Sequence, residues 1–357
     1  MSTAHDTTAH KTNEKDYRLC PRYIDKLGRT PMLNACYQGD LELMKFYKKR
    51  GDGDLTLKGS DGNTPMHIAM LNNRLDIGQW LYDNGAQDSI HATCEKYGAT
   101  PLHLACCATP LLRCFNCWRY NSSTSRIFAS SLEAVKWCVQ KGADVNKATK
   151  DGRTPMCIAS TKGHLGICKY LYANGAATDV QTPDNDGETP LLGAAFKGHL
   201  EMVQWLHANG AVQTPDVDGR TPLFIAAFKG HLEMVQWLHT NGGSVTQPDN
   251  EGTTPMCIAS QEGHLNICKY LYSNGAAADV QTPGVVGQTP LLGAVSKGHL
   301  EMVQWLHTNG GSVTQPRNDE CTPMYIASFL GHLNICKYLY ANGAAADVQT
   351  PGVVGQT

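Results

Sequence analysis

Apolar residues along the chain follow a pattern that restarts at a Thr-Pro pair about every 33 residues. Each of these pairs leads into an apolar stretch, and the Thr residues in this register are Thr30, Thr64, Thr100, Thr154, Thr189, Thr221, Thr254, Thr289 and Thr322. Successive pairs are 32 to 36 residues apart, apart from one interval of 54 between Thr100 and Thr154. Self-similarity on this scale predicts a stack of small units, each of which buries its apolar face against the next.

Residues 219–243 show how one unit is built. Thr221 is expected to cap a helix, and Pro222 suits the first helical turn, where a missing N–H costs nothing. Gly230 can adopt the left-handed conformation that ends this helix. A second helix then runs to Asn241, and its apolar residues recur at helical spacing, as Leu232, Val235 and Leu238. The Asp-, Asn-, Gly- and Pro-rich residues that follow predict a turn or hairpin.

Two short helices cannot bury enough apolar surface between themselves to offset the conformational entropy of ordering about 33 residues. Neighbouring units on both sides can supply the missing cover. The pattern therefore predicts an all-α solenoid of stacked helix-turn-helix units with projecting hairpin loops.

The repeat sets the expected domain organisation. We expect a disordered tail over residues 1–18 and one elongated repeat domain over residues 19–344. The long interval predicts an insertion near residues 108–130 of the third unit. Residues 342–357 repeat residues 274–289, so residues 345–357 read as the truncated start of a further repeat.

Several segments resemble the ankyrin repeat. They are NTPMHIA (63–69), ATPLHLA (99–105), KGADVN (141–146) and GHLEMVQWLH (198–207 and 230–239). The resemblance covers nine units over residues 28–344. It departs from the family motif where His follows Thr-Pro-x, since only His67 and His103 keep that His. The hydrogen bond of this His to the Thr is lost elsewhere, and we expect an array less stable than a consensus array.

Composition narrows the class of partner. A formal net charge of −2 argues against nucleic acid or an anionic membrane as the main partner. No apolar run is long enough to span a bilayer, and the polar N-terminus does not read as a signal peptide. The 14 cysteines are spread over the repeats rather than arranged as a disulfide framework, so we expect reduced thiols in the cytoplasm or the nucleus.

Three recurring residue types are interpreted as structural. An aromatic residue at one place in every second helix is expected to form a packing ladder between adjacent second helices. The histidines after the inter-helix glycines are expected to pack, since the ankyrin motif carries His there; they are His164, His199, His231, His264, His299 and His332. Buried packing is also expected for Cys157, Cys168, Cys257, Cys268 and Cys336.

The inserted third unit carries the main candidate for chemistry. His91 and Cys94 precede it and Cys114 and Cys117 lie within it, and paired ligands two residues apart suit tetrahedral zinc. A normal Thr-Pro-Leu-His helix lies between the two pairs in the sequence. A zinc site would form only if this helix placed both pairs close together. The alternative is a surface loop, and its apolar residues could fold back on the stack or bind a partner. No standard enzymatic signature is found, and nothing in the sequence requires a cofactor.

The resemblance to ankyrin repeats implies that ligands bind the concave side, which the loops and the exposed flank of each first helix form. The variable residues at those places are the predicted protein-binding residues: Tyr37, Leu71, Arg153, Lys162, Phe196, Lys197, Arg220, Phe228, Lys229, Lys297 and Phe329. Phe196 and Phe228, each followed by Lys, form the best candidate pair of binding aromatics. The alternative is that these rings only cover neighbouring helix surface.

We therefore expect a non-enzymatic, monomeric scaffold that binds partner proteins, with no nucleic acid, no membrane insertion and no cofactor. One alternative is an ankyrin fragment of a larger multidomain protein, such as a channel, kinase or ubiquitin-ligase adaptor. The other is a metal-dependent or thiol-based activity at the inserted third unit.

Overall fold

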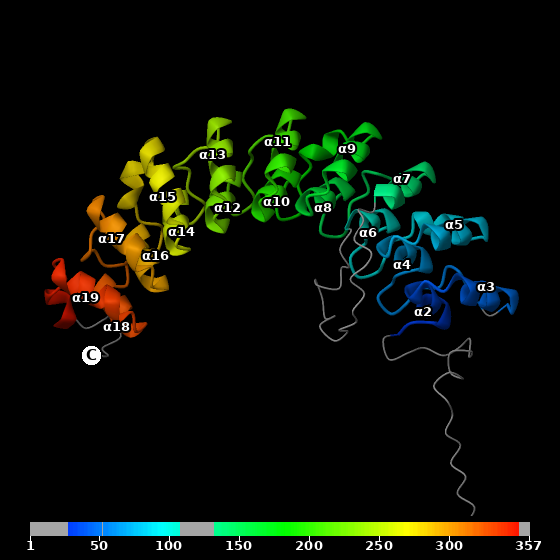
Figure 1. Ribbon diagram of the computed structural model, residues 1–357, viewed down its shortest axis with the longest axis horizontal. Helices are drawn as coiled ribbons and strands as arrows, with labels where there is room; N and C mark the ends of the chain where they lie inside the picture. The colour runs from blue at the N-terminus through cyan, green and yellow to red at the C-terminus, as the bar shows by residue number, and fades with distance from the viewer. Residues whose placement is uncertain (1–27, 52, 108–131, 350–357) are drawn as a thin grey trace, which may run out of the picture. The chain divides into compact units, whose positions relative to one another are not determined.

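The computed structural model describes residues 28–51, 53–107 and 132–349 (Figure 1). Over these ranges all regular structure is helical and no strand occurs, which confirms the all-α, helix-turn-helix prediction. The described chain falls into two compact units. The first contains the residues up to Ile158 with Gly166–Ala176, and the second contains Ala159–Leu165 with the residues from Ala177. The single domain expected over residues 19–344, the insertion expected near 108–130 and the segments expected at 1–18 and 345–357 stay predictions. Residues 1–18, 108–130 and 350–357 lie outside the described ranges.

The first unit contains helix pairs that follow the Thr-Pro register. Their bounds are α2 (Pro31–Gln38), α3 (Leu41–Lys49), α4 (Pro65–Leu71), α5 (Leu75–Asp83), α6 (Pro101–Cys107) and α7 (Leu132–Gln140), with a 3₁₀ turn η1 (Gln87–Ile90). The first helices α2, α4 and α6 pack side by side (Figure 1). A further pair, α8 (Pro155–Thr161) and α9 (Leu165–Ala173), lies where the two units divide.

The second unit repeats this arrangement. Its helices are α10 (Pro190–Lys197), α11 (Leu200–Ala208), α12 (Pro222–Lys229), α13 (Leu232–Thr240), α14 (Pro255–Gln261), α15 (Leu265–Leu271), α16 (Pro290–Lys297), α17 (Leu300–Thr308), α18 (Pro323–Phe329) and α19 (Leu333–Ala341). Short turns η3 (Thr178–Val180), η4 (Tyr272–Ala276), η5 (Ala277–Val280) and η6 (Ala346–Gln349) complete it. The first helices from α10 to α18 contact one another in order, and each packs on its own second helix (Figure 1).

Thr-Pro starts the first helices for the reason that the sequence suggests. In α12, the Thr221 side chain accepts a hydrogen bond from the Phe224 N–H at 3.1 Å, and Pro222 occupies the first helical turn. The same bond joins Thr189 to Leu192 at 3.3 Å and Thr254 to Cys257 at 3.2 Å. Each cap satisfies a backbone donor that the helix leaves unpaired.

The inter-helix glycine has a second role that depends on the next repeat. Gly230 ends α12 in the left-handed region, with φ of 79°. A Cβ at this position would lie 2.6 Å from Cε1 of His264, which belongs to the following repeat. His264 Nε2 also donates to the Phe228 carbonyl at 3.2 Å. The repeated histidine is therefore a packing residue here, as expected.

The predicted aromatic ladder is confirmed between several successive second helices, whereas the aromatic residue of α3, Phe46, is 43% exposed. Trp237 of α13 meets the His207 ring of α11 edge-on, with ring centroids 5.3 Å apart. Tyr270 meets the His239 ring at 5.8 Å, and the two residues share a 2.9 Å hydrogen bond. Trp137 stands edge-on to Tyr82 in the first unit, at 5.9 Å. These contacts hold successive second helices together.

The loops between repeats form a regular series in the second unit. In three of them an aspartate accepts backbone N–H groups two and four residues ahead; Asp184 does so from Asp186 and Glu188, Asp216 from Asp218 and Arg220, and Asp249 from Glu251 and Thr253. Single backbone hydrogen bonds then link adjacent loops, as from the Asn250 N–H to the Asp218 carbonyl at 2.9 Å. This series places the loop residues at the same end of consecutive first helices.

No helix in the described ranges is both long enough and apolar enough to cross a bilayer.

Candidate binding groove

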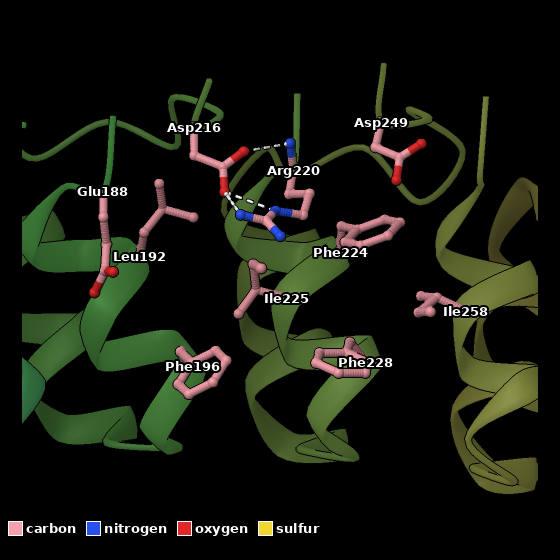
Figure 2. A pocket seen from close by; sticks show the side chains of 10 residues that line it. All are labelled: Glu188, Leu192, Phe196, Asp216, Arg220, Phe224, Ile225, Phe228, Asp249 and Ile258. Atoms are coloured by element: carbon pink, nitrogen blue, oxygen red, sulfur yellow. Dashed lines mark hydrogen bonds and ion pairs between the residues drawn. The ribbon is translucent and has the colours of Figure 1, made fainter. Parts of the chain in front are cut away.

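A groove of about 300 Å³ lies across the first helices α10, α12 and α14 of the second unit (Figure 2). Its lining residues are Glu188, Leu192, Phe196, Asp216, Arg220, Phe224, Ile225, Phe228, Asp249 and Ile258. Figure 2 shows Asp216, Arg220 and Asp249 at the loop end of these helices and Phe196 and Phe228 toward the opposite end. We call this surface the groove.

The floor of the groove is apolar. Leu192 of α10 and Phe224 and Ile225 of α12 form one buried cluster, and the half-buried Ile258 of α14 packs against it. Residues four apart on a helix lie on the same face, so Leu192 and Phe196 line the groove from one side. The apolar floor at Leu192 is therefore continuous along α10 with the Phe196 ring.

Two aromatic rings and two lysine ammonium groups form the edge of the groove at the C-terminal ends of α10 and α12. The Phe196 ring is 36% exposed, and the Phe228 ring is half-buried. Lys229 Nζ lies 4.1 Å from the centroid of the Phe196 ring and 4.4 Å from that of Phe228, so it lies within contact distance of both rings. Lys197 Nζ lies 5.0 Å from the Phe196 centroid. Cation–π contacts of this kind hold the two ammonium groups over the ring faces.

The loop edge is acidic although it contains Arg220. The Arg220 guanidinium pairs with Asp216, with both Nε and Nη2 at 2.8 Å from Oδ2, and with Asp218 at 2.9 Å. Asp216 Oδ1 also accepts the Arg220 backbone N–H at 2.9 Å. Because its own loop supplies both carboxylates, Arg220 is held in place and its charge is offset. Asp249 adds further negative charge to this edge.

The structure brings together part of the predicted set of binding residues. Phe196, Lys197, Arg220, Phe228 and Lys229 meet around the groove on α10 and α12. The other predicted residues of the second unit lie elsewhere along its first helices: Lys162 is half-buried after α8, Lys297 is exposed at the end of α16, and Phe329 is 75% exposed at the end of α18.

The predicted residues of the first unit have local contacts of their own. Tyr37 lies under the Arg29 guanidinium, at 5.0 Å from ring centroid to Cζ. Leu71 packs against a buried cluster that contains Cys94 and Leu104. Arg153 Nε lies 3.5 Å from an Asp151 carboxylate oxygen. Their role in binding stays a prediction.

Sequence reasoning missed most of the groove floor. Leu192, Phe224, Ile225 and Ile258 are not among the predicted binding residues, nor are the loop carboxylates Asp216 and Asp249. The available signal was the i, i+4 spacing of Leu192 with Phe196 and of Phe224 with Phe228, which puts each pair on one helix face.

The zinc hypothesis depends on residues that are only partly described. Cys114 and Cys117 lie outside the described residues. His91 is exposed and Cys94 is 3% exposed, so the two differ in access to solvent. Within the described ranges no cluster of His, Cys, Asp and Glu could hold a metal ion. The hypothesis stays a prediction.

Among the described cysteines, all but Cys321 and Cys336 are buried. Burial raises the pKa of the Cys257 and Cys268 thiols to about 12. A thiol with so high a pKa is a poor nucleophile at neutral pH, because the thiolate is the reactive form. Cys157 is buried as expected, whereas Cys336 is only half-buried.

Comparison with known families identifies the repeat. The model for three copies of the ankyrin repeat matches residues 11–92, 32–120, 126–215, 194–282 and 274–350, and the single-repeat model matches residues 97–150. The chain belongs to the ankyrin repeat family. This confirms the resemblance drawn from the Thr-Pro register. Ankyrin repeats indicate a protein–protein interaction domain, and proteins built from them are generally interaction modules rather than enzymes.

Ankyrin relatives align with less than half of this chain. A probable 26S proteasome regulatory subunit, p28, of Saccharomyces cerevisiae is 27% identical over 163 residues, which are 45% of this chain and 61% of that protein. A protein of Rickettsia bellii that is named for ankyrin repeats is 32% identical over 159 residues, 44% of this chain and 75% of that protein. The Drosophila melanogaster transient receptor potential cation channel subfamily A member 1 is 24% identical over 189 residues, 46% of this chain and 16% of the channel.

Proposed function

We propose that this protein is a non-enzymatic scaffold that binds a segment of a partner protein in the groove. The observation that carries the proposal is an apolar floor continuous with two aromatic rings that solvent still reaches, at Phe196 and Phe228. Large aromatic side chains beside a desolvated pocket supply much of the binding energy in protein interfaces. A volume of about 300 Å³ is within the range of binding clefts and suits a few side chains of a partner.

The family assignment and one relative support a role in protein assembly. Ankyrin repeats are interaction modules, and the yeast relative is named as a regulatory subunit of the 26S proteasome. We carry over from this only the general class of function, binding to other proteins. A monomeric state and a cytoplasmic location are part of the proposal. Light scattering of the purified protein and imaging of a tagged chain test these two points.

The double substitution Phe196→Ala/Phe228→Ala tests the proposed function. Each lost aromatic anchor is expected to cost about 2 kcal/mol of binding, so partner recovery in quantitative affinity capture should fall more than about tenfold. Both rings are partly exposed, so the variant is expected to keep its helical circular dichroism.

The matched control is Phe46→Ala/Tyr340→Ala, which removes two exposed aromatic rings, 43% and 59% exposed, from the second helices α3 and α19. This control should recover the same partners in the same amounts as the wild type. Equal recovery of every partner by the groove variant would rule out the groove as the binding site.

A further inference from the structure

The groove has two edges of opposite charge. Beside Arg220, the loop edge carries the carboxylates of Asp216, Asp218 and Asp249. Three carboxylates against one guanidinium leave this edge acidic, and the Glu188 carboxylate lines the groove beside Gly193 of α10 (Figure 2). Asp249 uses Oδ1 to accept the backbone N–H groups of Glu251 and Thr253 at 3.0 and 2.8 Å, and no hydrogen bond or ion pair engages its Oδ2 within the described ranges. A partner cation therefore meets net negative charge at this end.

The opposite edge is basic. Lys197 and Lys229 end the helices α10 and α12, and both ammonium groups lie over the exposed Phe196 ring. Neither lysine is engaged in an ion pair within the described ranges: Lys197 contacts the Phe196 ring, and Lys229 contacts the rings of Phe196 and Phe228. Basic residues in the last turn also suit the negative end of the helix dipole.

The apolar floor separates the two edges by the length of one first helix. An eight-residue helix such as α12 is about 12 Å long, because each residue rises about 1.5 Å. About four residues of an extended partner chain cover this distance, at about 3.3 Å per residue. One short segment can therefore reach both edges while its central side chain lies over Ile225 and between the two rings.

We propose that the groove selects a partner segment with a basic residue, then a large apolar residue, then an acidic residue along the α12 direction. The proposal rests on the proposed function and names the chemistry of its partner. Arg or Lys of the segment pairs with the carboxylates around Asp249 and Glu188, the apolar side chain covers the floor, and the acidic residue pairs with Lys197 or Lys229. Complementary charges at both ends fix the orientation of the segment and disfavour segments of reversed charge order.

Peptide selection on the intact protein tests this pattern without knowledge of the natural partner. The probe is a displayed library of random peptides of about twelve residues, long enough to span the groove when extended. Peptides that bind the wild type but not Phe196→Ala/Phe228→Ala define the groove-dependent set. Their affinities are then measured for Glu188→Gln/Asp249→Asn, which keeps the side-chain shapes and the Asp249 acceptor but removes two charges.

The matched control is Glu201→Gln/Glu233→Gln, which removes the same charge from exposed positions on the second helices α11 and α13. The groove-dependent peptides should be rich in the order basic, apolar, acidic. They should lose about tenfold in affinity for Glu188→Gln/Asp249→Asn and change less than about twofold for the control. Replacing the acidic residue of a peptide by its amide should weaken binding to a similar extent.

Two results would overturn the inference and have different meanings for the function. Groove-dependent peptides without a basic residue, or with equal affinity for Glu188→Gln/Asp249→Asn, would overturn the charge pattern and leave the groove as a binding site. A selection in which no peptide distinguishes the wild type from Phe196→Ala/Phe228→Ala would overturn both the charge pattern and the proposed use of the groove.

Discussion

Single residues in this chain act through contacts with the next repeat as well as through their own backbone. Gly230 needs a positive φ to end α12, and its Cα also lies against the His264 imidazole of the next repeat. A side chain there would meet two separate penalties, the left-handed conformation and a steric clash. Glycine is required at this position for both reasons.

Gly230→Ala is expected to destabilise the protein by about 2 kcal/mol or more, as measured by urea unfolding. The control is Gly242→Ala, because Gly242 has φ of 94° and a Cβ there would meet no atom within 4 Å. This control bears only the cost of the left-handed backbone, about 1 kcal/mol. Equal losses for the two variants would show that the His264 contact imposes no constraint.

Helices in this protein are short, and the first helices of the second unit begin at a Thr cap. The first helices of the second unit have seven or eight residues, which is too short for stability in isolation. Thr221 is 4% exposed, and its hydroxyl pairs with the Phe224 N–H. Loss of this acceptor leaves a buried donor unpaired at the start of α12, the helix that carries Ile225 and Phe228.

Thr221→Ala should therefore destabilise the protein by about 1–2 kcal/mol. Thr240→Ala is the control, because Thr240 is exposed and its hydroxyl bonds only at the end of its own helix. It donates to the carbonyls of Gln236 at 3.0 Å and Trp237 at 2.9 Å, and it accepts from the Asn241 side-chain amide at 3.5 Å. The control should change stability by less than about 0.5 kcal/mol in the same urea titration. A smaller effect at Thr221 than at Thr240 would contradict the capping role.

At the scale of the whole molecule, the two units differ in buried histidines. His67 and His103 of the first unit are fully buried, and burial lowers the pKa of each to about 4 from 6.5. Each ring bonds to its own Thr and to a carbonyl further along the chain, as His67 does to Ala99 at 3.0 Å. The second unit has Leu192, Phe224 and Leu292 at the corresponding places.

Acid should therefore weaken the first unit in particular. Below pH 6.5 these histidines take up protons in the unfolded chain but stay neutral in the folded protein until the pH approaches 4. Their contribution to the free energy of unfolding is therefore fully present above pH 6.5 and is lost as pH falls toward 4. The loss is about 2 kcal/mol per histidine at pH 5. Hydrogen exchange at pH 5 and pH 7.5, corrected for intrinsic rates, should show a greater loss of protection in α4 and α6 than in α12 and α16.

The control for this prediction is His67→Leu/His103→Leu, which installs the residue that the second unit carries at two of these places. This variant should show less pH dependence in α4 and α6 than the wild type. An unchanged pH profile would mean that other groups govern the acid response. Asp279 acts in the opposite sense, since burial raises its pKa to about 6 and acid below that value favours its native state.

Helix positions, caps and the repeat family follow from the sequence because each depends on residues only a few positions apart. The Thr-Pro caps, the glycine stops and the 3.6-residue period need no knowledge of neighbouring repeats. Thr221, Gly230 and Asn241 mark the bounds of α12 and α13 as predicted. The candidate rings at Phe196 and Phe228 were also found this way, as apolar residues at variable places.

The groove itself was decided by the tertiary structure, because its walls come from three repeats that are more than 30 residues apart in sequence. Only packing placed Lys229 over both rings and brought Ile258 to the floor. Packing within the loop also paired Arg220, one of the predicted binding residues, with Asp216 and Asp218, so Arg220 neutralises part of the acidic edge. Local periodicity determines which face of a helix is apolar, whereas the spacing between helices determines which exposed groups meet.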